Sequence, residues 1–208
     1  MKITRHDIDK LGKQARVNLM NSITGFKSAN LIGTANTNGL SNLAVFSTVT
    51  HLGSNPPLIG MITRPTTVPR HTFANILATG HYTINHIHQS FTAAAHQCSA
   101  KYDDEVSEFK ACGFSEEYVD GCLAPFVEAA VIKIGMQHKE TIEIKTNGTL
   151  LIVGEVLLIH AADGVSDTEM NIDLNKAGTV TISGLNNYHN AQLIQSYGKV
   201  IPDTNFRS

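Results

Sequence analysis

The chain has 208 residues, of which 42% are hydrophobic and 16% charged, with a formal net charge of −2; these values describe an ordinary globular protein and exclude disorder, fibrous repeats and coiled coils. No segment gathers Lys or Arg into a positive stripe, so nucleic acid is not expected as a partner. No apolar run approaches the roughly 20 residues that span a bilayer, and the first residues are polar, so we expect a soluble cytoplasmic protein with no membrane association.

The first predicted element is a helix over about 4–20. Thr4 and Asp7 have the spacing of a capping box. Apolar residues recur on one face of this helix, at Ile8, Leu11, Ala15 and Leu19. We expect this helix to lie across the body of the protein or across a partner subunit.

From residue 30 onward the pattern becomes that of strands. Two apolar runs, 31–35 and 43–49, flank Asn38-Gly39, which is the strongest short signal for a β-hairpin. Next come a strand over 58–62 after Pro56-Pro57 and a helix over 66–78 that ends at Gly80. The later predicted elements are strands over 82–87, 126–136, 140–145 and 149–160, a helical stretch over 90–113, and a second hairpin turn at Asn147-Gly148.

Many strands with two hairpin turns and helices at the margins predict a mainly β (α+β) fold. We expect an antiparallel Greek-key barrel with peripheral helices, because a doubly wound sheet would need strands and helices in regular alternation. No linker or repeat divides the chain, so residues 1–208 are treated as one domain. Its parts are the N-terminal helix (about 4–20), the barrel (about 30–160) and a C-terminal extension (161–208).

The segment 64–76 is a candidate anion-binding site. Two arginines and three threonines stand around the start of the predicted helix, where free backbone N–H groups and the helix dipole favour negative charge. A phosphate suits forked guanidinium donors with neutral hydroxyls beside them. A capped helix with two solvated arginines explains the same pattern, and the segment alone does not separate the two interpretations. The residues are Arg64, Thr66, Thr67, Arg70 and Thr72.

The strand that begins at Asn42 mixes small, apolar and hydroxyl residues where a plain core strand would alternate. A flat heterocycle with polar edges requires that mixture. By itself the pattern favours an ordinary strand whose Ser47 and Thr48 face solvent, and the anion-binding segment shifts the balance towards a ligand.

Other chemistry is weakly indicated. Cys98, Cys112 and Cys122 form no Cys-x-x-Cys pair, so neither a disulfide framework nor a zinc site is expected. His86 shares a strand face with His88, but nothing completes a metal-ligand set, so we predict no metal and keep His86 as a candidate contact to a cofactor or substrate. No dinucleotide-binding, P-loop or hydrolase-elbow motif occurs.

Read in order, these segments resemble the flavin reductase-like family, whose fold is the FMN-binding split β-barrel. The resemblance covers about 30–188, and each anchor is weak alone while the ordered set is specific. The anchors are Asn42-Leu-Ala-Val-Phe-Ser-Thr, Asn55-Pro-Pro-Leu-Ile-Gly, Arg64-Pro, Arg70-His-Thr-Phe-Ala-Asn-Ile, Gly80-His-Tyr-Thr-Ile-Asn-His, Ser99-Ala-Lys-Tyr, Glu108-Phe, Gly113, Gly184-Leu and Tyr188.

The resemblance implies FMN at the interface of a homodimer. The flavin phosphate would lie near Arg64, Arg70 and Thr72, and the ring edge against the strand from Asn42 to Thr48. Asn85 and Ser99 take positions close to the flavin in such proteins, and Val45 stands where the family commonly has Pro. The full set of candidate cofactor contacts is Asn42, Ala44, Val45, Phe46, Ser47, Thr48, Arg64, Thr66, Arg70, Thr72, Asn85 and Ser99.

The resulting hypothesis is an NAD(P)H-dependent flavin reductase that passes electrons to free flavin, a partner oxygenase or another acceptor. Because the flavin carries the hard chemistry, no catalytic dyad is required. One alternative is a non-enzymatic FMN-binding electron carrier. Another is a flavin-dependent oxidase or oxygenase acting on its own small substrate, with His86 or His189 as weak catalytic candidates.

Overall fold

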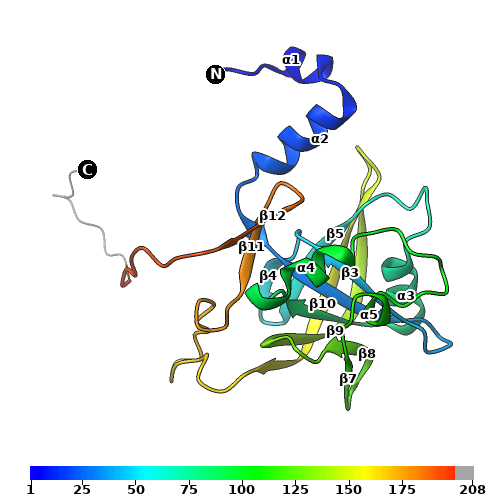
Figure 1. Cartoon of the computed structure of the whole chain (residues 1–208), viewed down its shortest axis with the longest axis vertical. Helices are drawn as coiled ribbons and strands as arrows, with labels where there is room; N and C mark the ends of the chain where they lie inside the picture. The colour runs from blue at the N-terminus through cyan, green and yellow to red at the C-terminus, as the bar shows by residue number, and fades with distance from the viewer. Residues whose placement is uncertain (200–208) are drawn as a thin grey trace.

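A computed structural model describes residues 1–199, and its centre is a seven-stranded antiparallel sheet that curls into a barrel (Figure 1). The strand order is β3-β2-β6-β9-β10-β5-β4, so β3 and β4 form the two edges. The mainly β, antiparallel split-barrel prediction is confirmed. The strands are β2 (Asn30–Ala35), β3 (Ser41–Phe46), β4 (Thr50–Ser54), β5 (Pro57–Thr63), β6 (His81–His86), β9 (Ile132–Ile144) and β10 (Thr149–Ala161).

Two smaller sheets flank the barrel. A three-stranded sheet joins β1 (Lys27–Ser28), β11 (Val180–Ser183) and β12 (Asn187–Asn190). A hairpin of β7 (Glu116–Val119) and β8 (Cys122–Val127) packs beside β6, where Thr83 Oγ1 donates to the Pro125 carbonyl oxygen (2.7 Å). Sequence reasoning missed five short strands, β1, β4, β7, β11 and β12, because none carries a long alternating pattern.

The helices are short and lie at the margins of the sheet. The predicted N-terminal helix is in fact two helices, separated at Leu11 and Gly12, and neither has a buried residue. The capping box of Thr4 and Asp7 is confirmed. Both helices project away from the barrel (Figure 1), so they do not cross its body, and the other expected position, across a partner subunit, stays a prediction. The helices are α1 (Arg5–Lys10), α2 (Lys13–Ser22), α3 (His71–Thr79), η1 (Gln89–Phe91), α4 (Thr92–Gln97) and α5 (Glu108–Ala111).

Proline and loop chemistry explain the other differences from the predicted elements. The helix expected from 66 begins at His71, because Pro69 disfavours helical geometry at the residue before it. It ends as predicted at Gly80, which adopts the left-handed conformation (φ 73°). The helical stretch over 90–113 is interrupted by irregular chain between α4 and α5, and the strand over 126–136 is split into β8 and β9.

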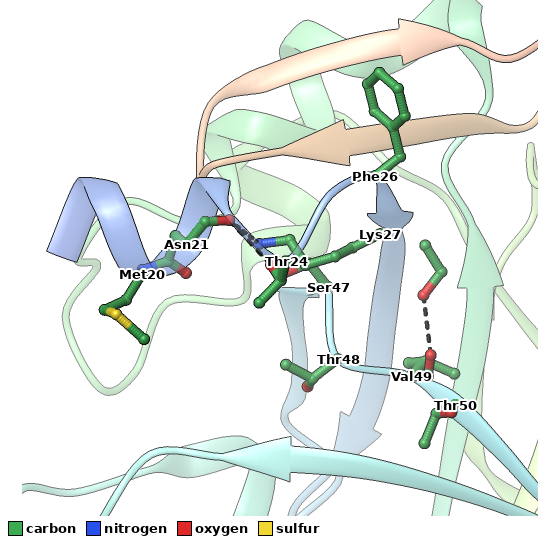
Figure 2. Close-up of a pocket in the computed structure, with 10 residues that line it drawn as sticks. Met20, Asn21, Thr24, Phe26, Lys27, Ser47, Thr48, Val49 and Thr50 are labelled. Atoms are coloured by element: carbon green, nitrogen blue, oxygen red, sulfur yellow. Dashed lines mark hydrogen bonds between the residues drawn. The ribbon is translucent and has the colours of Figure 1, made fainter. Parts of the chain in front are cut away.

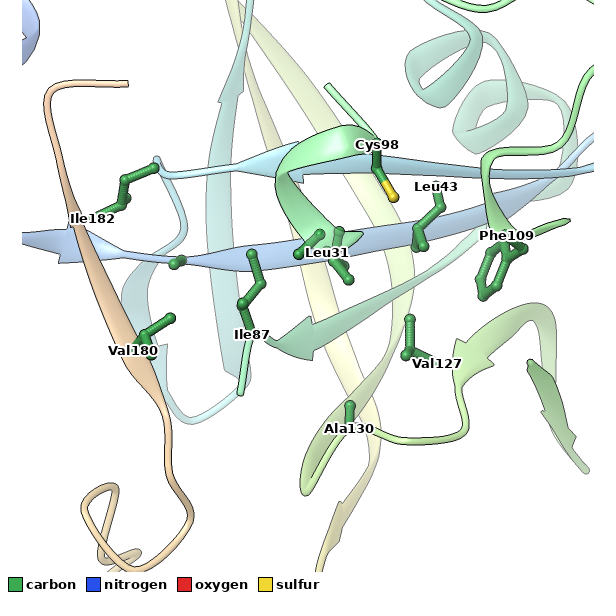
Figure 3. Close-up of a cluster of buried hydrophobic side chains, with 11 residues drawn as sticks. Leu31, Leu43, Ile87, Cys98, Phe109, Val127, Ala130, Val180 and Ile182 are labelled. Atoms are coloured by element: carbon green, nitrogen blue, oxygen red, sulfur yellow. The ribbon is translucent and has the colours of Figure 1, made fainter. Parts of the chain in front are cut away.

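Two apolar clusters occupy opposite faces of the sheet. One contains Ile32, Met61, Ile84 and Ile152 from four strands, with Ile76 from α3 packed against them. The other contains Leu31, Leu43, Ile87 and Phe109, and α4, α5, β8 and β11 cover it (Figure 3). The period of two places alternate residues of β2 in different clusters, so β2 is buried throughout.

The three cysteines are free and differ in exposure, which predicts their reactivity. Cys98 and Cys122 are buried, and burial raises the pKa of both thiols, whereas Cys112 is half-buried. Since the thiolate is the reactive form, we expect Cys112 to react first with a disulfide reagent at pH 8, and the other two only after denaturant is added. Cys112→Ser should remove the fast phase, and a fast phase that persists in this variant would contradict the assignment.

Between residues 1 and 199, no helix combines the length and the apolar character that crossing a bilayer demands.

Candidate functional site

The strand β3 and the arginine-containing segment lie side by side and are joined at two points. Asn42 Nδ2 donates to Thr72 Oγ1 (3.1 Å), and both residues are buried. At the other end, Thr48 Oγ1 accepts from the backbone N of Ile62 (3.0 Å) and donates to its carbonyl oxygen (2.9 Å). Because Ile62 precedes Arg64 by two residues, these bonds bring the two regions selected from the sequence close together.

The outer edge of β3 is closed along one half and open along the other. Leu43 N donates to Glu108 Oε2 (3.0 Å), and the Ser41 and Ser107 hydroxyls are 2.6 Å apart, so the start of α5 covers this end. Backbone groups on an antiparallel edge strand alternate in direction, so those of Val45 point outward as those of Leu43 do, and β3 ends one residue later at Phe46. The open half therefore offers backbone donors and acceptors to a ligand.

The side chains of β3 contribute less to this edge than the sequence suggested. Val45 packs against one apolar cluster and Phe46 against the other, so both belong to the core. The Thr48 hydroxyl is committed to Ile62. Ala44 lies between Leu43 and Val45 and is half-buried, while Ser47 lines a cavity. Contacts to a ring at this strand would come from the backbone and from Ser47.

The arginine segment has the electrostatics of an anion site. Arg64 and Thr66 are exposed, and Arg70 is half-buried with Nε donating to the Pro65 carbonyl oxygen (3.4 Å). Arg70 is the N-cap of the nine-residue helix α3, no side chain caps that terminus, and its first turn contains no acidic residue. Neither arginine has a carboxylate partner among the ion pairs of residues 1–199, so both guanidinium groups are available to a phosphate.

A cavity of about 440 Å³ opens beside the end of β3. We call it the Lys27 pocket; α2, the turn after it, β1 and the β3–β4 connection form its walls (Figure 2). Sequence reasoning missed Lys27, because a lone lysine in a two-residue strand matches no motif. The lining residues are Met20, Asn21, Thr24, Phe26, Lys27, Ser28, Ser47, Thr48, Val49 and Thr50.

Asn85 and Ser99, placed near the flavin by resemblance, make their contacts within the protein. Asn85 is fully buried; its Nδ2 donates to the Leu31 carbonyl oxygen (3.1 Å) and to Thr83 Oγ1 (2.9 Å), and its Oδ1 accepts from Val127 N (3.0 Å). This side chain joins β6 to β2 and β8. The exposed Ser99 donates to the His96 carbonyl oxygen (2.6 Å) at the end of α4. Contact of either residue with flavin stays a prediction.

The two histidines with a weak catalytic expectation lie beside the three-stranded sheet. Burial lowers the pKa of His86 to about 4, and its Nδ1 lies 3.3 Å from Thr179 Oγ1. His86 is therefore neutral at pH 7 and has no proton to donate from an imidazolium. His189 lies 2.8 Å from Ser183 Oγ and packs edge-on against Phe26, at the rim of the Lys27 pocket. Over residues 1–199, no three His, Cys, Asp or Glu side chains gather into a metal-binding group.

A family model for the flavin reductase-like domain matches residues 23–197 of the chain. The chain belongs to the flavin reductase-like family. Among solved structures, this flavin reductase-like chain is 43% identical to a Shewanella frigidimarina protein assigned as a flavin reductase with a split barrel domain. The TM-score is 0.93, and the match covers 96% of this chain and 100% of the other. No curated protein matches the sequence.

More distant structures share the fold. Nitrilotriacetate monooxygenase component B from Bacillus cereus is 17% identical, with a TM-score of 0.84 and coverage of 95% of this chain and 98% of the other. Flavoredoxin from Desulfovibrio vulgaris is 18% identical, with a TM-score of 0.73 and coverage of 83% and 91%. The family and the split barrel are thus established.

Proposed function

We propose that this flavin reductase-like protein binds FMN and reduces it with NAD(P)H. The phosphate would lie at Arg64, Arg70 and Thr72, and the ring along the open half of β3. The observation that supports this assignment is the double link between the strand and the arginine segment, through Asn42–Thr72 and Thr48–Ile62. It holds a cationic helix start close to an unpaired strand edge.

The residues present fit a flavin mononucleotide. Two unpaired guanidinium groups and the uncapped N-terminus of α3 suit a dianionic phosphate. The outward backbone groups of Val45 and the hydroxyl of Ser47 suit the carbonyl and nitrogen edge of a planar ring. Bound flavin supplies the redox chemistry by accepting hydride from the nicotinamide, and the protein binds, orients and shields it. Donors at the ring edge would favour the reduced, more negative form.

The proposal includes a homodimer in which the partner covers the open half of β3, and an onward acceptor that is free flavin or a partner oxygenase. Three observations support these two parts: β3 is an edge strand, α1 and α2 have no buried residues, and a structure of the same fold is named as a monooxygenase component. Three free cysteines support a reducing compartment, and we propose the cytoplasm.

The direct test is spectroscopic. Purified protein mixed with FMN and either NADH or NADPH should bleach the flavin absorbance, with the rate proportional to protein concentration. Bleaching with neither nucleotide would remove the reductase assignment. If the protein retains bound flavin in that case, the electron-carrier alternative is favoured, and oxygen uptake that depends on an organic compound would favour an oxidase or oxygenase.

Arg64→Ala should weaken FMN binding by about 1.5 to 3 kcal/mol, because a charge-assisted contact to phosphate is lost. Isothermal titration of the flavin-free protein measures this change. Since Arg64 is exposed, the melting temperature of the flavin-free variant should stay near that of the wild type. Arg16→Ala, on the exposed surface of α2, is the matched control and should bind FMN normally. Unchanged affinity for FMN in Arg64→Ala would show that Arg64 does not contact the phosphate and is an ordinary solvated surface residue.

A further inference from the structure

Lys27 presents a cation to the Lys27 pocket without an anion to balance it. Its Nζ donates to the Asn21 carbonyl oxygen (3.1 Å) and to the Gly184 carbonyl oxygen (2.9 Å). Figure 2 shows the side chain reaching across the pocket towards α2. An ammonium group has three donors, so one remains free. None of the lining residues is Asp or Glu, and Lys27 has no carboxylate partner among the ion pairs of residues 1–199.

Lys27 is half-buried, and desolvation lowers its pKa. Buried or partly buried charges are ordinarily paired. Ser47 and Thr50 also line the pocket, and their hydroxyl groups add neutral donors. The pocket therefore has the donor set for an anion, held in place by two backbone carbonyls that orient Nζ.

The remaining walls point to an organic anion of nucleotide size. Met20, Phe26 and Val49 supply apolar surface, and Phe26 is 70% exposed. The volume of about 440 Å³ lies within the range of small-molecule sites, which is roughly 300 to 1,000 Å³. The pocket is also separate from the arginine segment: neither Arg64 nor Arg70 lines it, and Ser47 is the residue where it reaches the open edge of β3.

We propose that the Lys27 pocket binds the phosphate of a second nucleotide, distinct from the flavin phosphate at Arg64. This inference rests on the proposed function, because a second nucleotide is needed only where a reductant or a free flavin acceptor must reach the ring. A ring placed against β3 would leave the phosphate-bearing part of such a nucleotide beside Ser47 and Lys27. The two sources, pyridine dinucleotide and free flavin, share this chemistry and are separated by the titration below.

The experiment is an equilibrium titration of full-length protein preloaded with one equivalent of FMN. ADP-ribose carries the pyrophosphate and adenosine of NADH but cannot transfer hydride, so it reports binding alone; excess FMN is the second ligand. Lys27→Gln should lower the affinity for the ligand that binds by about tenfold or more, the loss of one charge-assisted contact. Lys27→Arg, which keeps the charge, should stay close to the wild type, and Lys145→Gln on the exposed β9–β10 turn is the surface control.

The outcomes separate the sources and the failures. If Lys27→Gln loses binding of ADP-ribose, the Lys27 pocket binds the pyridine dinucleotide that serves as reductant. If it loses binding of a second equivalent of FMN, the pocket binds the free flavin that serves as acceptor. The proposal is overturned if the wild type binds neither ligand, if Lys27→Gln binds as the wild type does, or if Lys27→Gln loses its first FMN, which would make the pocket part of the flavin site. Failure of the proposed function gives a different result: the protein does not bleach flavin with NADH or NADPH. The ADP-ribose titration does not depend on hydride transfer, so it is measured independently of that result.

Discussion

Gly33→Ala is expected to lower the free energy of unfolding by about 3 kcal/mol, because the added methyl group has no space. Gly33 lies in β2 opposite Thr83 of β6. A Cβ atom there would overlap the carbonyl oxygen of Pro125 and stand 2.5 Å from Thr83 Oγ1. It would therefore intrude into the hydrogen bond that ties β8 to β6 (2.7 Å). Urea unfolding followed by circular dichroism measures the effect.

The matched control for this change is Gly53→Ala. Gly53 also lies in a strand, β4, but a Cβ atom there would meet the Pro56 carbonyl oxygen at 3.6 Å, which is ordinary contact. Its stability should stay within about 1 kcal/mol of the wild type. Equal loss in the two variants would show that glycine flexibility, and not the close approach of β8, decides the result.

Acid should destabilise the protein through His86, by about 3 kcal/mol between pH 6.5 and pH 4. In the folded state burial lowers the pKa of His86 to about 4, from a usual value of 6.5. Between these values the unfolded chain binds a proton that the folded protein excludes, so stability falls as the pH falls. Above about pH 7.5 the residue is almost entirely neutral in both states and contributes little pH dependence.

Urea unfolding at pH 7.5, 6, 5 and 4.5 tests this expectation. His86→Gln keeps a hydrogen-bonding group near Thr179 and cannot titrate, so its stability curve should be flatter than that of the wild type over this range. The difference between the two curves isolates His86 from the other titrating groups. Parallel curves would show that the imidazole is solvated and that its pKa is close to normal.

Sequence signals predicted correctly those elements that a few neighbouring residues determine, such as the hairpin turns. The left-handed conformation at Gly148 (φ 72°) and the bond from Thr149 N to Asn147 Oδ1 (3.0 Å) confirm the second hairpin, where Asn-Gly determines the turn. The N-terminal helix shows the limit of this reasoning. Its apolar periodicity predicted a buried face, but neither α1 nor α2 has a buried residue, and periodicity does not identify what covers a helix.

The candidate site was predicted only in part, because local sequence patterns do not show which segments meet in the fold. Residue types near 42–48 and 64–72 indicated a ligand, and the structure places these segments together through Asn42 and Thr72. The sequence did not reveal that Val45 and Phe46 would be core residues, because β3 has clusters on both faces. Nor did it reveal the Lys27 pocket, which assembles from two separate segments of the chain, 20–28 and 47–50.

The half-open edge of β3 has a consequence for handling the protein. A free strand edge is a template on which another chain can add a strand, and such pairing leads to aggregation. In this protein α5 covers the end of β3 near Leu43. The end near Val45 has no such cover from α5 and could pair with another chain. If FMN lies along this end as proposed, it would also cover the open edge, and we expect that added flavin during expression keeps more of the protein from aggregating.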